Sequence, residues 1–97
     1  MKPVRLSEKE VKVIKETVKE FDPEAEVYLF GSRVEADKRG GDIDLLVLSD
    51  RIGWRERRAI RVELLLKLGD RKIDLIVEPK TSTEPLVKLV KEEGVKL

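Results

Sequence analysis

The stretch Asp42-Ile43-Asp44-Leu45-Leu46-Val47-Leu48 predicts a strand at the centre of a small sheet. Side chains alternate along a strand, so the apolar residues of 43–48 would lie on both of its faces. This pattern is typical of a strand that other elements cover on both sides. The two aspartates at its start are two residues apart, so their side chains would point to the same face.

Helices and strands are expected on either side of this strand. Ser7 and Glu10 form a capping-box pattern, and apolar residues at helical spacing follow them. Short β-branched and aromatic runs indicate the other strands. In chain order, the predicted elements are a helix over 7–21, strands over 27–30 and 43–48, a helix over 54–68 and a strand over 72–77. Gly69 ends the helix over 54–68. A last helix is capped by Thr83, has Pro85 in its first turn and ends at Gly94.

The order of these elements predicts a small α/β domain with three strands and helices on the faces of the sheet. The pattern leaves open whether the strands run parallel, antiparallel or mixed. A chain of 97 residues has room for one core, so we expect a single domain over 1–97.

The net charge argues against a general nucleic-acid-binding protein. The chain has 21 Lys and Arg against 20 Asp and Glu, a net charge of +1, whereas a nucleic-acid binder usually carries a strong basic excess. Charged residues make up 42% of the chain, and it contains no Asn or Gln. This composition favours a protein from a hot environment.

Several residue types are missing altogether. Without cysteine there is no disulfide or thiolate metal site, and without histidine a catalytic base must be a carboxylate, a lysine or the substrate itself. No apolar stretch approaches the roughly 20 residues that span a bilayer, and the N-terminus lacks a signal-peptide core. We therefore expect a soluble, cytoplasmic protein.

Three features could carry chemistry together. Gly31-Ser32 directly follows a predicted strand, where free N–H groups at a helix start could bind phosphate. Asp42 and Asp44 would stand side by side and repel each other unless a hard cation such as Mg²⁺ binds them. Asp74, within an apolar strand, could complete a three-carboxylate cluster if that strand lies beside 43–48.

Such a cluster suits two-metal phosphoryl or nucleotidyl transfer, with Asp74 as the third ligand and as proton acceptor. Each feature also has an ordinary interpretation. An acid-x-acid triplet arises by chance in a chain with 20 acidic residues, Gly31-Ser32 could be a plain turn, and Asp74 could be a charge that protects a sheet edge. Their joint occurrence at strand ends favours the catalytic interpretation.

The segment Tyr28-Leu29-Phe30-Gly31-Ser32-Arg33, followed by Asp42-Ile43-Asp44-Leu45-Leu46-Val47, resembles the minimal nucleotidyltransferases of the polymerase-beta-like superfamily. Their signature is Gly-Ser, a spacer of about nine residues and Asp-x-Asp. The sequence departs from many members in having Gly41 before the first aspartate, a variant that marks a subgroup.

The resemblance implies a mixed sheet flanked by helices and the transfer of a nucleoside monophosphate, AMP from ATP or from another NTP. It implies phosphate contact by Gly31, Ser32 and Arg33. Two Mg²⁺ ions would be held by the catalytic carboxylates, Asp42, Asp44 and Asp74. Relatives of this size typically work with a separate helical partner of the HEPN or substrate-binding type, and some are antitoxins that nucleotidylate a partner toxin.

Two features of the second predicted helix leave alternatives open. Five arginines lie within 51–61 against one glutamate, which is either a solvated face or a patch for phosphate, RNA or an acidic partner. The apolar arc of 54–68 is wider than a surface helix needs, so it marks either an interface, with a partner or a second copy, or a helix wedged into the core.

Three functions remain in competition at this stage. An Mg²⁺-dependent nucleotidyltransferase that acts on a hydroxyl of a partner protein or small molecule fits the residues best. The alternative is a weakly catalytic or non-catalytic antitoxin or assembly module that acts by binding its partner. A nucleic-acid-binding domain fits least well, because of the net charge.

Overall fold

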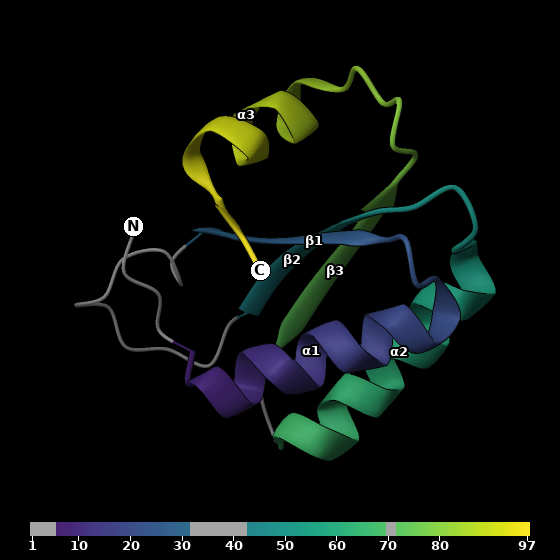
Figure 1. The fold of residues 1–97 in the computed structure, drawn as a ribbon, viewed down its shortest axis with the longest axis vertical. Helices are drawn as coiled ribbons and strands as arrows, with labels where there is room; N and C mark the ends of the chain where they lie inside the picture. The colour runs from purple at the N-terminus through teal and green to yellow at the C-terminus, as the bar shows by residue number, and fades with distance from the viewer. Residues whose placement is uncertain (1–5, 32–42, 70–71) are drawn as a thin grey trace.

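The computed structural model describes residues 6–31, 43–69 and 72–97 (Figure 1). Its elements are α1 (Glu8–Phe21), β1 (Glu26–Phe30), β2 (Ile43–Leu48), α2 (Trp54–Leu68), β3 (Ile73–Glu78), α3 (Pro85–Glu93) and β4 (Val95–Lys96). The predicted helices and strands are confirmed to within two residues at their ends, while the two-residue β4 was not predicted.

The sheet is mixed, in the order β3-β2-β1-β4. β2 pairs with β1 antiparallel and with β3 parallel, and β4 adds to the far side of β1. This resolves the strand directions that the sequence pattern left open. β3 is therefore an edge strand, and its neighbour β2 is central, as predicted.

Helices cover the two faces of the sheet unequally (Figure 1). α1 and α2 pack together on one face, and α3 lies on the other, mainly over β1 and β4. β2 is buried along its whole length except at Asp44, which is half-buried. The larger core cluster, under α1 and α2, includes Ile14, Leu29, Leu45, Ile60 and Leu64, and the smaller one, under α3, includes Tyr28, Leu46, Leu48, Val87 and Val90.

The helix starts follow local sequence with one exception. The capping box of α1 is present, since the Ser7 hydroxyl accepts from Glu10 N and the Glu10 carboxylate accepts from Ser7 N. The prediction that Thr83 caps α3 is wrong, because Glu84 occupies the N-cap position. Pro85 holds the residue before it in an extended conformation, which moves the start of the helix one residue on.

A buried carboxylate ties the end of α1 to the end of β2. Asp22 Oδ2 accepts a 2.6 Å hydrogen bond from Ser49 Oγ, and that hydroxyl accepts from the backbone N–H groups of Arg51 and Ile52. Asp22 also accepts from Glu24 N. The hydrogen bond from Ser49 is the main reason that the pKa of Asp22 lies below its usual value.

This cluster predicts an acid-sensitive part of the stability. Because the folded-state pKa of Asp22 is lowered, its contribution is present above about pH 4 and is lost as the pH falls through the folded pKa. Ser49→Ala should cost about 1–3 kcal/mol of unfolding free energy at pH 7. It should also reduce the loss of stability below about pH 4, as measured by urea denaturation.

The exposed Thr81→Ala variant is the control, because it removes a hydroxyl that lies at the surface. Equal losses of unfolding free energy below about pH 4 in the wild type and in Ser49→Ala would contradict this account of Asp22.

Among the described helices, none combines the length and the apolar character needed to cross a membrane.

Candidate functional site

The sheet register brings two of the three predicted carboxylates together. Asp44 of β2 is the direct partner of Asp74 of β3, and on its other side it is the partner of Phe30 of β1. Since partners in register point to the same face, Phe30, Asp44 and Asp74 form one row across three strands. Neighbouring strands lie about 4.8 Å apart, so the two carboxylates stand side by side.

This row lies on the face of the sheet that carries α3, and Phe30, at one end of it, packs against the core cluster under that helix. Asp44 is half-buried and Asp74 is exposed. The sequence left two interpretations of Asp74 open, the third carboxylate of a cluster beside the 43–48 strand or a charge that protects a sheet edge. The structure places it both beside Asp44 and at the edge of the sheet. On β3, Asp74 is exposed on this face while Ile73 and Leu75 are buried on the other, and the residues from Ile76 to Glu78 are half-buried.

Gly31 lies immediately against Asp44. Its φ of +73° is in the left-handed region that favours glycine, and a Cβ added there would collide with the Asp44 carboxylate, Oδ2 first. Gly31 therefore lets the chain leave β1 directly over this carboxylate. The glycine and the acid, far apart in the predicted signature, are in close contact in the fold.

The chemistry of these oxygen donors fits a hard divalent cation. Two carboxylates about 5 Å apart repel each other by about 3 kcal/mol at an effective dielectric constant of 20. A cation bound between them makes the total electrostatic energy of the group favourable. Within the described part of the chain, Asp74 makes no hydrogen bond or ion pair, so its oxygens can take a ligand. Mg²⁺ is commonly held by one or two carboxylates, with water and phosphate as its other ligands.

The remaining predicted site residues, Ser32, Arg33 and Asp42, lie outside the described residues. In residues 6–31, 43–69 and 72–97, no three acidic side chains converge as a metal site would require. The structure thus brings Gly31, Asp44 and Asp74 together, and the three-carboxylate cluster depends on a residue that it does not describe.

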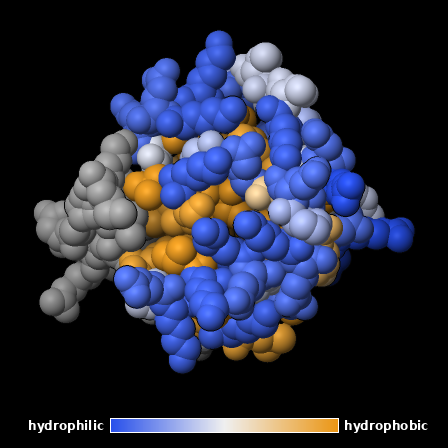
Figure 2. Space-filling model, viewed as in Figure 1, coloured by the Kyte–Doolittle hydropathy of each residue, from blue (hydrophilic) through white to orange (hydrophobic). Residues whose placement is uncertain are grey.

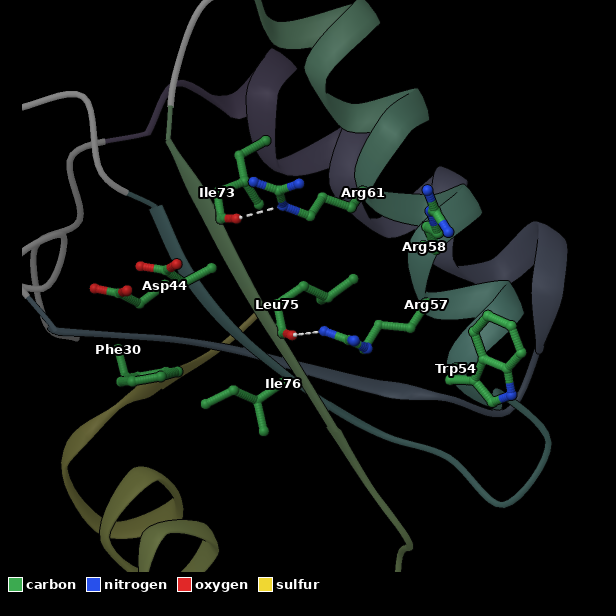
Figure 3. A pocket seen from close by; sticks show the side chains of 10 residues that line it. Phe30, Asp44, Trp54, Arg57, Arg58, Arg61, Ile73, Leu75 and Ile76 are labelled. Carbon is green, nitrogen blue, oxygen red and sulfur yellow. Dashed lines mark hydrogen bonds between the residues drawn. The ribbon is translucent and has the colours of Figure 1, made fainter.

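The two carboxylates open into a groove of about 750 Å³ that runs over the edge of the sheet (Figure 3). Asp44 lies on one side of β3, and side chains of α2 lie on the other. The groove is lined by Phe30, Asp44, Trp54, Arg57, Arg58, Arg61, Ile73, Asp74, Leu75 and Ile76. It therefore joins an acidic end at the sheet to a basic end at the helix.

Two arginines of the basic end are fixed to the edge of β3. Arg57 Nη1 donates to Leu75 O at 3.3 Å, and Arg61 Nε donates to Ile73 O at 3.0 Å (Figure 3). These carbonyls point away from β2 and would otherwise lack a backbone partner. The arginines cap the free edge, which hinders the addition of another strand there.

Sequence reasoning treated the arginines of 51–61 as a solvated face or a binding patch, and it did not place them in the groove. A signal was available, because Arg57 and Arg61 are four residues apart and so share one helix face. Without the sheet order, however, nothing indicated that this face meets the strand that carries Asp74.

Comparison with protein families identifies the chain over most of its length. The model of a family described as a nucleotidyltransferase domain matches residues 11–97. No curated protein sequence matches the chain significantly.

Solved structures with a similar fold come from a toxin–antitoxin pair. A Tyr-to-Ala variant of the MntA-HepT complex matches 95% of this chain and 71% of its own, with 24% identity and a TM-score of 0.67. A second variant of the same complex carries two Asp-to-Glu changes with one residue between them. It matches 90% of this chain and 70% of its own, with 25% identity and a TM-score of 0.68. The fold is similar to that of the MntA antitoxin.

Proposed function

The chain belongs to the nucleotidyltransferase domain family, and we propose that it transfers a nucleoside monophosphate, AMP from ATP, to a hydroxyl group of a partner protein or a small molecule. The observation that supports this most strongly is the pairing of Asp44 with Asp74 on adjacent strands, with Gly31 against the first of them. We take residues 1–97 to act as a single catalytic domain.

Each predicted site residue has a role in this proposal. Asp42, Asp44 and Asp74 would hold two Mg²⁺ ions, while Gly31, Ser32 and Arg33 would contact the phosphates of the nucleotide. When bound, Mg²⁺ would offset the charge of the carboxylates and of the phosphate oxygens. Gly31 supports the phosphate role, because it allows a phosphate to approach the backbone closely.

The reaction balances as an in-line displacement. The acceptor hydroxyl oxygen forms a bond to the α-phosphorus, and the bond from that phosphorus to the bridging oxygen breaks, so that pyrophosphate leaves. The hydroxyl proton passes to the carboxylate of Asp74, which is exposed and so can exchange the proton with water. No histidine exists to compete for this role.

The partner in this proposal is a separate helical protein of the HEPN type. The similarity to MntA, crystallised with its toxin, supports this choice. The partner would present its own hydroxyl to the groove that contains Asp44 and Asp74.

Label transfer in the presence and absence of metal tests the proposal. The protein is incubated with ATP labelled at its α-phosphate and with the protein encoded by the adjacent reading frame. Excess EDTA should abolish incorporation of label into the partner, and added Mg²⁺ should restore it, because the carboxylates need the cation to accept a triphosphate. Incorporation that is unchanged by EDTA, or absent with every NTP, would contradict the proposal.

A second candidate is an antitoxin that acts by binding alone. The exposed apolar side chains of α2 favour it, since they suit contact with a partner. An Asp44→Asn, Asp74→Asn double variant separates the two candidates. If the variant neutralises the partner as well as the wild type does, the binding module is correct.

A further inference from the structure

The outer face of α2 carries apolar side chains that the fold does not use. Trp54, Val62 and Leu66 are 64%, 49% and 80% exposed. Together with Arg58 they are spaced four residues apart, so they form one stripe along the helix. We call Trp54, Arg58, Val62 and Leu66 the α2 stripe.

The helix meets the core through other residues, so the stripe is not needed for folding. Ile60 and Leu64 are fully buried, and Leu65 and Leu68 pack against the core cluster. The wide apolar arc of α2 therefore has two parts: one packs into the core, and the other faces outward. In Figure 2 an apolar area is visible at the lower margin, over α2.

The stripe is continuous with the proposed active site. Trp54 and Arg58 line the groove that contains Asp44 and Asp74, and they also line a second hollow on the outer face of α2. That hollow has a volume of about 490 Å³ and extends to Val62. A ligand seated along the stripe would therefore reach the carboxylates without leaving the surface.

Further positive charges lie beside the groove end of the stripe. Arg57 and Arg61 donate only to neutral backbone carbonyls, and within the described residues no carboxylate pairs with them. A guanidinium has five N–H donors, so most remain available while the carbonyls hold its orientation. Arg55 stacks on the Trp54 ring at 5.3 Å and adds further positive charge.

We propose that the α2 stripe, together with Arg57 and Arg61, docks the acceptor protein by binding a segment of it that is both acidic and apolar. This docking would bring the acceptor hydroxyl to the carboxylates of Asp44 and Asp74. This inference rests on the proposed function and adds the surface and the chemistry of recognition. Charge complementarity selects the acidic segment. Val62 and Leu66 continue the stripe beyond the groove, and such exposed apolar side chains favour a protein over a nucleic acid.

The mode of docking also follows from the contacts. The two arginines occupy the outward carbonyls of Ile73 and Leu75, so the partner does not extend the sheet as a further strand. It binds by side chains in a groove. The exposed tryptophan and the arginines are the residue types that most often dominate the affinity of such surfaces.

Binding without nucleotide tests this inference separately from catalysis. The probe is a fluorescent copolymer of glutamate and tyrosine, with a copolymer of lysine and tyrosine and single-stranded polyuridylate as comparisons, all titrated by anisotropy at physiological salt. We expect the acidic copolymer to bind most tightly. Arg58→Glu should weaken it at least tenfold and Leu66→Ser at least threefold.

Matched changes on the other face of the molecule serve as controls. Lys88→Glu and Leu89→Ser make the same chemical changes at exposed positions of α3, and they should alter the affinity less than twofold. Asp44→Asn should bind the acidic copolymer at least as well as the wild type, even if it transfers no nucleotide.

Three results would overturn the inference. They are tighter binding of polyuridylate than of the acidic copolymer, equal affinity in Arg58→Glu and Lys88→Glu, and a dimer of the chain that Leu66→Ser dissociates. A failure of label transfer with intact, Arg58-dependent binding would instead count against the proposed function and leave this inference supported.

Discussion

Asp44→Asn should lower nucleotidyl transfer at least about 100-fold while leaving the protein folded. The change removes one of the two carboxylate charges that the register places side by side. Metal stabilisation of a transition state contributes several kcal/mol, and each 1.36 kcal/mol corresponds to about tenfold in rate. The amide keeps the size of the side chain, so the buried neighbours of β2 are not disturbed.

The rate of label transfer at saturating ATP and Mg²⁺ measures this effect, and circular dichroism confirms the fold. Glu20→Gln on α1 is the matched control, because it removes the same charge from an exposed position on the opposite face of the sheet. A reduction of less than about threefold in Asp44→Asn would mean that this carboxylate holds no metal needed for the reaction.

Gly31→Ala should have a comparable effect on transfer through a different cause. An alanine at a φ of +73° costs about 1–2 kcal/mol of backbone strain, and its Cβ meets the Asp44 carboxylate. Either the carboxylate or the turn must move. A displacement of about 1 Å at a reacting centre can lower the rate about 100-fold.

Gly69→Ala separates strain from contact. Gly69 also has a positive φ, of +86°, but a Cβ there would meet no atom within 4 Å. Both variants should lose stability in urea denaturation, while only Gly31→Ala should lose transfer activity. If the two variants retain equal activity, the close approach of Gly31 to Asp44 has no part in the function.

Much of the fold could be predicted from local sequence. The capping box at Ser7, the apolar strand 43–48 and the stop at Gly69 each depend on neighbouring residues alone, and each is confirmed. β4 could not be predicted, because two residues carry no periodic signal and the strand forms only by pairing with β1. The sheet order could not be predicted either, because it depends on contacts between segments that are far apart in the sequence.

The site was predictable in composition but not in arrangement. The sequence predicted that Asp74 would join Asp42 and Asp44 if its strand lay beside 43–48, and the parallel register is what places Asp74 opposite Asp44. The exposure of Asp74 and the position of Arg57 and Arg61 both follow from β3 being the edge strand, which the sequence raised only as one of two interpretations of Asp74. Ser32, Arg33 and Asp42 remain predictions from the sequence.

Metal binding by the carboxylate pair is the most direct measurement of the central claim. Mn²⁺ can replace Mg²⁺ as a paramagnetic probe, titrated by electron paramagnetic resonance in the presence of a non-hydrolysable ATP analogue. We predict that the wild type binds Mn²⁺ and that Asp44→Asn and Asp74→Asn each weaken binding at least about tenfold. Equal Mn²⁺ affinity in the wild type and in both variants would contradict the claim that these two side chains form a metal site.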